Sequence, residues 1–405
     1  MLRAVALFLA TTLCAATAEA AQAPAPDPSQ GDGRVSSFYT WKGSIPATPG
    51  HLLRQETLAP TLGLANAAAD LRILYSSTDG VDGKTPVAVS GLFFLPKGKP
   101  PAGGWPLLAW AHGTVGMADI CAPSWAGLPL RIEAVLNTWL EHGFAVVATD
   151  YQGLGTPGPH PYMAVRPAAY GVLDSIRAVQ HAFPAVGKKL VVAGYSQGAA
   201  AVLGAGIFQP SYAPGLDISG IIAAGVPYTT PETVATMRED TANQVDNTLM
   251  YPLYLGLMAQ QSDPTLRASD MFSEKALPLF ELTRRACVWQ LAVEILGSGL
   301  TRAESVKAGY AKALAANMSL LEYPSLKLSQ PVFIGIGEED RDAPTRLQLE
   351  LVKRACAEGT IVETHLYAGM THYQALTRSV PDAVAFAEKV LAGKTIARIC
   401  APEAE

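Results

Sequence analysis

The stretch LVVAGYSQGAAAVL, residues 190–203, decides the fold of this chain. Its first four residues are an apolar run that predicts a buried strand, and its last five predict the start of a helix. Between them, Gly194-Tyr195-Ser196-Gln197-Gly198 is the one G-x-S-x-G motif of the sequence. A strand, a tight turn with this motif and a helix form a nucleophile elbow, in which glycines clear the turn around a strained serine. We therefore expect Ser196 to be a nucleophile rather than a serine in an ordinary turn.

Strands and helices alternate on both sides of this motif. Apolar or β-branched runs bounded by Gly and Pro predict strands at Leu71–Tyr75, Val87–Leu95, Pro106–Ala111, Phe144–Thr149, Leu190–Ala193, Ile218–Ala224, Pro331–Ile336 and Ile361–Tyr367. Helical patterns between them cover Arg131–His142, Ala168–Ala182 and Gln197–Phe208. Such alternation predicts an α/β architecture, with a mostly parallel sheet and helices on both faces. Together with the elbow, it indicates the α/β-hydrolase fold.

One interval interrupts this alternation. Residues 229–329 contain no convincing strand, and their pattern is helical and amphipathic with Pro and Gly breaks. This segment of roughly a hundred residues is longer than an ordinary crossover connection. We expect a helical cap inserted at 229–329, between a first part of the hydrolase core at 36–228 and a second part at 330–405. One more helical layer on the sheet is the simpler alternative.

The N-terminus has the pattern of a secretory signal peptide. Met1-Leu2-Arg3 is a short positive segment, Ala4–Ala15 is apolar, and Ala18-Glu19-Ala20 is a small-x-small cleavage pattern. We expect residues 1–20 to be cleaved off near Ala20 and the mature chain to be secreted or periplasmic. The following residues, 21–35, are rich in Pro, Ala and polar residues and predict a flexible leader.

Composition and charge exclude several classes of protein. The 405 residues are 49% hydrophobic, which argues against general disorder, and 30 basic against 35 acidic side chains give a net charge of −5. A nucleic-acid-binding protein needs a basic face, so we expect no nucleic-acid partner. Beyond the N-terminus, no apolar run reaches the about 18 residues that a membrane span needs, so we expect no integral membrane span.

A serine nucleophile needs a base, and histidine is the usual one. In the α/β-hydrolase fold the chain order is nucleophile, acid, histidine, which leaves two histidines after Ser196. His365 lies inside a predicted strand and is expected to be structural. His372 follows that strand in a loop before the last helix. We therefore expect His372 to be the base.

The acid should lie in the loop after the strand Pro331–Ile336. Four carboxylates compete in this loop, and most of them are expected to be solvated charges. Asp340 begins the pattern D-x-x-A-P, close to a pattern often found at the acid of such enzymes. We expect Asp340 to fix the tautomer of His372 without taking its proton, with Asp342 as the alternative.

An oxyanion hole should complete the site. One donor is expected to be the backbone N–H of Gln197, directly after the nucleophile. The other should come from the turn after an earlier strand, and Trp110-Ala111-His112-Gly113-Thr114 ends such a strand. Because Gly113 permits close approach, we expect the N–H of Thr114 to be the second donor and His112 to support the loop. A plain strand-ending turn is the alternative.

Export changes what the cysteines imply. Removal of Cys14 with the signal peptide leaves four: Cys121, Cys287, Cys356 and Cys400. Four cysteines in an exported chain suggest two disulfides, with three connectivities open. Zinc sites use closely spaced Cys or His, whereas these four are scattered, so we expect no metal site.

At these residues the chain resembles the secretory lipase family of α/β-hydrolases. The likeness lies in H-G-T followed by C-A-P-S within His112–Ser124, in D-Y-Q-G-L-G-T-P-G-P-H-P-Y at Asp150–Tyr162, and in the entry at Phe38-Tyr39. It covers nearly all of the mature chain, and the second string is far more specific than the serine motif. The resemblance implies a Ser-Asp-His esterase, without a cofactor, acting on acylglycerols or related esters, and a helical cap over an acyl tunnel.

We therefore expect a secreted serine carboxylic-ester hydrolase of lipase type, whose partner is an ester or lipid substrate and whose cap contacts a lipid interface. A serine peptidase or acyltransferase on the same fold is the alternative, and a catalytically dead binding module is a third. The tunnel would be lined from the apolar residues Met237, Leu249, Met250, Tyr251, Tyr254, Leu255, Leu257 and Met258.

For the disulfides we expect Cys121–Cys287 and Cys356–Cys400. The first would tie the loop on the oxyanion side to the cap. The second would fix the C-terminal tail to the helix after the acid loop.

Overall fold

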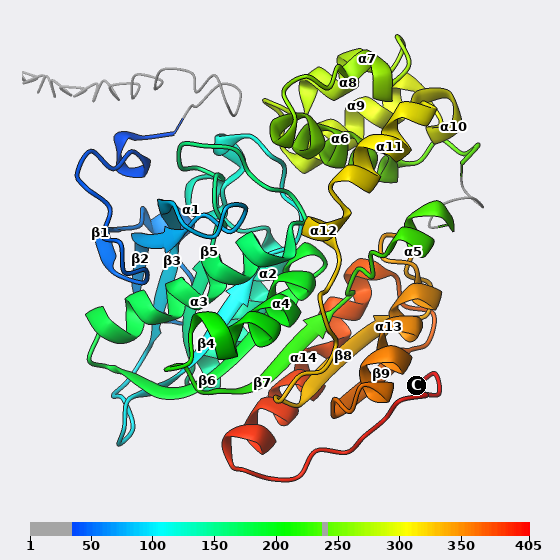
Figure 1. Ribbon diagram of the computed structural model, residues 1–405. Helices are drawn as coiled ribbons and strands as arrows, with labels where there is room; N and C mark the ends of the chain where they lie inside the picture. Colours follow the sequence, from blue (N-terminus) through cyan, green and yellow to red (C-terminus); the bar gives the residue numbers. More distant parts are fainter. Residues whose placement is uncertain (1–34, 237–241) are drawn as a thin grey trace, which may run out of the picture.

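A nine-stranded sheet runs through the computed structural model, which describes residues 35–236 and 242–405 (Figure 1). In sheet order the strands are β1 (Leu52–Thr57), β2 (Ala67–Thr78), β3 (Pro86–Pro96), β5 (Ala145–Thr149), β4 (Trp105–Ala111), β6 (Val186–Tyr195), β7 (Ile218–Ala224), β8 (Val332–Gly337) and β9 (Val362–Tyr367). The joins from β1 to β5 are antiparallel, and those from β5 to β9 are parallel. The predicted mostly parallel α/β sheet is thus confirmed. The predicted signal peptide, and the leader up to residue 34, lie outside the described residues.

The eight predicted strands correspond to β2 through β9, whereas β1 was not predicted. Its sequence, LLRQET, has no continuous apolar run, and its residues are half-buried or exposed at the edge of the sheet. An edge strand takes its pairing from one neighbour and needs little burial. Its sequence therefore carries only a weak strand pattern.

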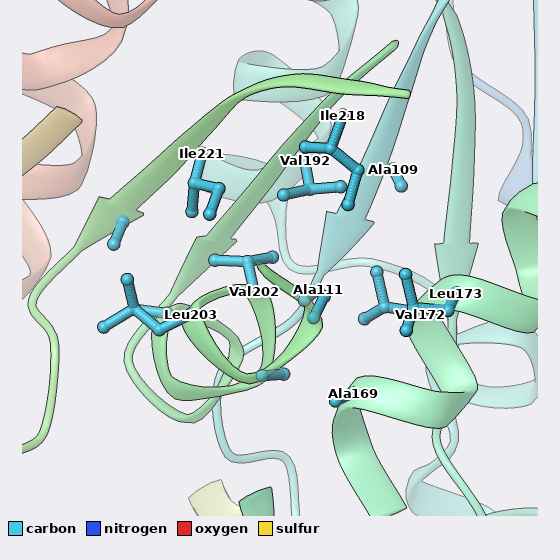
Figure 2. Close-up of a cluster of buried hydrophobic side chains, with 14 of the residues drawn as sticks. Ala109, Ala111, Ala169, Val172, Leu173, Val192, Val202, Leu203, Ile218 and Ile221 are labelled. Atoms are coloured by element: carbon cyan, nitrogen blue, oxygen red, sulfur yellow. The ribbon is translucent and has the colours of Figure 1, made fainter. Parts of the chain in front are cut away.

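Helices cover both faces of the sheet. One face carries α3 (Val165–Ala182), α4 (Gln197–Tyr212) and α13 (Thr345–Ala357), and the other carries α2 (Leu130–Glu141) and α14 (His372–Leu391). Figure 2 shows the first core, where Val192 and Ile221 of the sheet face Val202 and Leu203 of α4. Each such buried side chain contributes about 1.5–3 kcal/mol. Because both β6 and α4 are anchored in this core, the turn between them is held firmly.

The segment between β7 and β8 consists of helices and turns in the residues that are described, and it adds no strand to the sheet. Its elements are α5 (Pro231–Thr236), η4 (Asn247–Leu249), α6 (Met250–Ser262), α7 (Ala268–Met271), α8 (Leu277–Leu282), α9 (Val288–Ser298), α10 (Arg302–Ser305), α11 (Ala308–Ala316) and α12 (Met318–Leu321). Helices α6 to α11 form a lobe of their own (Figure 1), with a separate apolar core. We refer to residues 229–329 as the helical insertion.

Short helical turns complete the fold: η1 (Ser37–Tyr39), η2 (Pro60–Leu62), η3 (Asp119–Cys121) and α1 (Pro123–Ala126). Two disulfides join distant segments. Cys121–Cys287 connects η3 of the core to the start of α9, and Cys356–Cys400 connects α13 to the C-terminal tail. Both are the expected pairings. Among the described helices, none combines the length and apolar character of a membrane span.

Candidate active site

Ser196 lies in a sharp turn between the end of β6 and the start of α4. Its backbone has φ 55° and ψ −119°, a conformation that residues with a side chain rarely adopt. A Cβ atom on Gly194 would lie 2.1 Å from the carbonyl oxygen of Gly198, and one on Gly198 would lie 1.9 Å from that of Ala111. Both flanking positions therefore require glycine. The turn exposes part of Ser196 to a cavity between the core and the helical insertion.

His372 and Asp340 form a buried pair. His372 is the first residue of α14, and its Nδ1 lies 2.6 Å from Oδ2 of Asp340. Asp340 also accepts hydrogen bonds from the N–H of Ala343 and from Nε2 of Gln348, both at 2.9 Å. The Nε2 atom of His372 is buried and makes no hydrogen bond with any described residue. An imidazole that donates through Nδ1 carries its lone pair on Nε2, where it can accept a proton.

Two residues that the sequence did not single out enclose the ring of His372. Gly225 follows β7 with φ +61°, and a Cβ atom there would lie 2.6 Å from Cε1 of His372. On another side, the ring of Tyr195 lies 4.8 Å from the imidazole, measured between centroids. The sequence does show a glycine at the end of the strand after the elbow. It does not show that this glycine contacts His372, almost 150 positions further along the chain.

The alternative acid and the other histidine lie elsewhere. Asp342 lines the cavity and accepts a hydrogen bond at 2.5 Å from the hydroxyl of Tyr251 in α6. His365 lies in β9, where its Nδ1 contacts the Glu405 side chain and its ring stacks on Phe333 at 5.2 Å. Asp340 therefore contacts His372, whereas Asp342 and His365 contact other residues.

Residues of the segment Asp150–Tyr162 contact the side chains of both residues expected to form the oxyanion hole. The hydroxyl of Tyr162 lies 2.8 Å from Oγ1 of Thr114, and Nε2 of Gln197 lies 3.3 Å from Nε2 of His160. The loop after β4 and the first turn of α4 are therefore both held by one segment. The segment Asp150–Tyr162 after β5 therefore has a structural role at the site.

His112 lies beneath the loop that carries Thr114. Its Nδ1 lies 2.6 Å from the carbonyl oxygen of Gly113, and its own carbonyl accepts a hydrogen bond from the hydroxyl of Tyr151 at 2.7 Å. Burial lowers the pKa of His112 to about 4, and it lowers the pKa of His160 to about 4 as well. Both imidazoles are therefore neutral at pH 7, which suits a supporting role for His112.

The cavity at Ser196 is narrow, with a volume of ≈ 80 Å³. Its core side includes Thr114, Tyr162, Ser196 and Asp342. The insertion contributes Thr229, Val234, Tyr251, Pro252, Leu255, Arg302, Tyr310, Leu314 and Leu321. Of the residues expected in a tunnel, Tyr251 and Leu255 line this cavity. Leu249, Met250, Tyr254, Leu257 and Met258 are instead buried in the core of the insertion. Met237 lies outside the described residues.

A metal site is not apparent in residues 35–236 and 242–405, where no three His, Cys, Asp or Glu side chains come close enough to hold an ion. The chemistry available at the site is that of a serine hydroxyl, an imidazole and a carboxylate.

Comparison with known sequences points to one family. The model of the family described as secretory lipase matches residues 129–398. Lipase A of Moesziomyces aphidis is 28% identical over 244 residues, which are 56% of this chain and 51% of that protein. Lipase 7 of Candida albicans is 37% identical over 102 residues, 24% of this chain and 23% of that protein. The chain thus spans about half the length of the first relative and less of the second.

Comparison with solved structures gives the same fold. Candida antarctica lipase A in its closed state aligns with a TM-score of 0.72 and 20% identity, over 91% of this chain and 89% of that one. The rice cell wall degrading esterase LipA from Xanthomonas oryzae aligns with a TM-score of 0.64 and 17% identity, over 86% and 97%. The α/β-hydrolase fold expected from the sequence is confirmed.

Proposed function

Because the chain belongs to the secretory lipase family, we propose that it is a serine carboxylic-ester hydrolase that cleaves acylglycerols or related lipid esters. One observation carries the proposal. The strained Ser196 lines a cavity, and the imidazole of His372 lies 4.8 Å from the ring of the preceding Tyr195. The buried pair of His372 and Asp340 leaves Nε2 of that imidazole without a hydrogen bond among the described residues.

In the proposed mechanism, the hydroxyl of Ser196 attacks the ester carbonyl as His372 Nε2 takes its proton. Asp340 keeps Nδ1 protonated and stabilises the imidazolium. The acyl–oxygen bond then breaks, His372 returns the proton to the leaving alcohol, and the acyl group stays on Ser196. A water molecule, deprotonated by the same histidine, releases the fatty acid and restores the serine.

The negative charge of each tetrahedral intermediate is proposed to rest on the N–H groups of Gln197 and Thr114. Both lie where the contacts of His160 and Tyr162 restrain their side chains. A preorganised donor of this kind contributes about 2.7–4 kcal/mol to transition-state stabilisation. The donors contribute this much only if their loops stay in place. The contacts with Asp150–Tyr162 would keep these loops from relaxing.

The helical insertion is proposed to act as a cap that holds the acyl chain. Support comes from the cavity at Ser196, whose insertion side is mainly apolar and includes Leu255, Leu314 and Leu321 from three helices. A cavity with this lining favours hydrocarbon over a polar peptide side chain.

The same cap is proposed to contact a lipid surface through α9. Trp289, Val293 and Leu296 lie on one face of this helix and are 53%, 67% and 53% exposed, while Leu291, Ala292 and Ile295 are buried. A helix that is apolar on its solvent face as well as its buried face suits contact with an apolar phase.

Export is proposed from the N-terminal signal pattern, with cleavage near Ala20. Two disulfides support an oxidising compartment, because cytosolic thiols are normally kept reduced. Detection of a mature N-terminus at Ala21 in the medium or periplasm would test this step.

A hydrolysis panel tests the function as a whole. It comprises aryl esters with two to eighteen carbons, a triglyceride emulsion and a peptide amide, each with wild-type enzyme and Ser196→Ala. We expect ester hydrolysis that disappears in the variant. Activity on the peptide alone, or ester activity that survives Ser196→Ala, would refute the proposal.

A further inference from the structure

A second cavity, of ≈ 310 Å³, lies next to the candidate active site. Thr114 lines both this cavity and the one at Ser196. Tyr195 and Tyr373, which directly precede Ser196 and follow His372, line the second cavity as well. Its other walls come from the disulfide Cys121–Cys287 and from the start of α2. The two cavities therefore meet at the loop that carries Thr114.

Arg131 is the one charged side chain among the described residues that line this second cavity, since His112 is neutral at pH 7. Its guanidinium lies 4.2 Å from the ring centroid of Tyr373 and 5.3 Å from that of Trp289. The two rings lie 6.2 Å apart in a stacked arrangement. Such contacts fix the orientation of a guanidinium through its faces and leave the N–H groups at its edge available.

The first turn of α2 carries one carboxylate, Glu133, but in the described part of the chain it neither pairs with Arg131 nor lines the second cavity. No carboxylate or carbonyl among the described residues accepts a hydrogen bond from its guanidinium. Arg131 also lies in the first turn of α2, and the N-cap of that helix provides no side-chain acceptor. A cation at a helix N-terminus is unfavourable, because the helix dipole adds positive potential there. Arginine and helix end together would attract an anion.

We propose that this second cavity receives the alcohol part of the ester, and that Arg131 selects alcohols that carry a carboxylate or phosphate group. The inference rests on the proposed ester hydrolysis at Ser196. The cavity at Ser196 takes the acyl chain, so the alcohol must leave on another side of the reacting carbon. The second cavity is lined by Tyr195 and Tyr373, the chain neighbours of the nucleophile and of the base that protonates the alcohol, and it shares Thr114 with the cavity at Ser196.

Matched pairs of octanoate esters test this selection. One pair is 4-carboxyphenyl octanoate and its uncharged 4-carbamoylphenyl analogue, and the other is 1-octanoylglycerol 3-phosphate and 1-octanoylglycerol. We expect wild-type kcat/KM to be about tenfold higher for at least one anionic ester than for its neutral partner, mainly through KM, as a charge-assisted hydrogen bond provides. The pair that shows the preference identifies the anion. Added salt should reduce it.

Arg131→Gln keeps a planar group that can stack but removes the charge, so it should abolish the preference by lowering kcat/KM for the anionic esters to that of their neutral partners. Arg131→Lys should keep part of the preference. Arg378, which stacks on Tyr367 at 4.9 Å and does not line this cavity, provides the control Arg378→Gln, with an unchanged preference expected.

The outcomes separate the two proposals. If no ester is cleaved, the proposed function itself fails. If neutral esters are cleaved but wild type shows no anionic preference, or if Arg131→Gln retains it, only the second cavity has been misassigned. An equal loss for neutral and anionic esters in both Arg131 variants would mean a purely structural role for the stack, and it would also overturn the inference.

Discussion

The backbone of Ser196 stores strain, since a positive φ at a residue with a side chain costs about 1–3 kcal/mol. The structure holds this strain because β6 and α4 are both anchored in the core and because two glycines leave room for the turn. This strained turn places Ser196 at the cavity between the core and the helical insertion. At the residue scale, catalysis depends on what surrounds that one side chain.

The first prediction concerns the triad. Ser196→Ala, His372→Ala and Asp340→Asn should each lower kcat by about 10⁴-fold or more without unfolding the protein, since the three act as one unit. Steady-state kinetics on an eight-carbon ester would measure this, with circular dichroism to check folding. A double variant of Ser196 and His372 should lose little more than either single one.

Asp342→Asn is the matched control for Asp340→Asn, because both aspartates lie in the same loop and Asp342 contacts Tyr251 instead of His372. We expect it to keep most of the activity. A nearly normal Asp340→Asn beside an inactive Asp342→Asn would transfer the role of acid to Asp342.

The second prediction concerns Gly225. Gly225→Ala would place a methyl group 2.6 Å from the imidazole of His372, at a φ of +61°. We expect the ring to be displaced and kcat to fall about a hundredfold, the scale expected for a misplacement of about 1 Å, with a smaller change in KM. Gly215→Ala, where a Cβ atom would meet nothing within 4 Å, is the control. Equal kinetics for the two variants would contradict this prediction.

The sequence predicted Ser196, His372 and Asp340 because a short motif and the chain order of the fold point to them. It could not indicate Gly225 or the contacts of Tyr162 and His160, because these depend on how loops from different strands meet. At the level of elements, strands with long apolar runs were predicted, and β1 was missed because an edge strand has little need of such a run.

The third prediction concerns the acyl cavity and belongs to the scale of the element. Wild-type kcat/KM should rise from two-carbon to about eight-carbon esters. Leu255→Trp would fill space beside Ser196 and remove contact with about two or three methylenes, or roughly 2 kcal/mol, so kcat/KM for eight-carbon esters should fall about thirtyfold. Acetyl esters should be little affected.

Ile361→Trp serves as its control, because Ile361 is exposed just before β9 and does not line the cavity. An enzyme that prefers acetyl esters, and whose chain-length profile Leu255→Trp leaves unchanged, would show that the insertion does not form the acyl site.

The fourth prediction concerns α9. Val293→Asp combined with Leu296→Asp places charges on its solvent face and should reduce hydrolysis of a triglyceride emulsion severalfold, because charged groups resist transfer to an apolar phase. Dissolved short-chain esters should be cleaved as before. Val81→Asp, at an exposed apolar residue far along the chain, should change neither rate. Equal losses on both kinds of substrate would argue against contact with the lipid surface.

The fifth prediction concerns the stability of the whole molecule in acid. His112 and His160 have pKa values of about 4 in the folded chain and an ordinary value of 6.5, so between these limits the unfolded chain binds two protons that the folded chain does not. Asp150 opposes them, because burial raises its pKa to about 6 and the folded chain keeps one proton more. Burial raises the pKa of Asp174 as well, so this carboxyl also opposes the histidines. Each histidine should contribute a fall in stability of about 1.4 kcal/mol per pH unit as the pH drops from about 6 to about 4, and the two carboxyls should reduce the net slope.

Urea unfolding at several pH values would measure this slope. His160→Gln removes one of the two histidines, so its free energy of unfolding should change with pH by about 1.4 kcal/mol per pH unit less than that of the wild type in the same window. His142→Gln, at an exposed histidine, should retain the wild-type slope. A slope that His160→Gln leaves unaltered would contradict the prediction.

The pairing of the cysteines also has a consequence for how the chain is made. A polypeptide that crosses a membrane N-terminus first presents its cysteines in the order Cys121, Cys287, Cys356, Cys400. Each native bond joins consecutive members of that series, first with second and third with fourth. An oxidase that joins each newly exported cysteine to the preceding free cysteine would produce the native pairing, without a disulfide isomerase. The host for producing this protein needs an oxidising compartment, and it has little need of an isomerase.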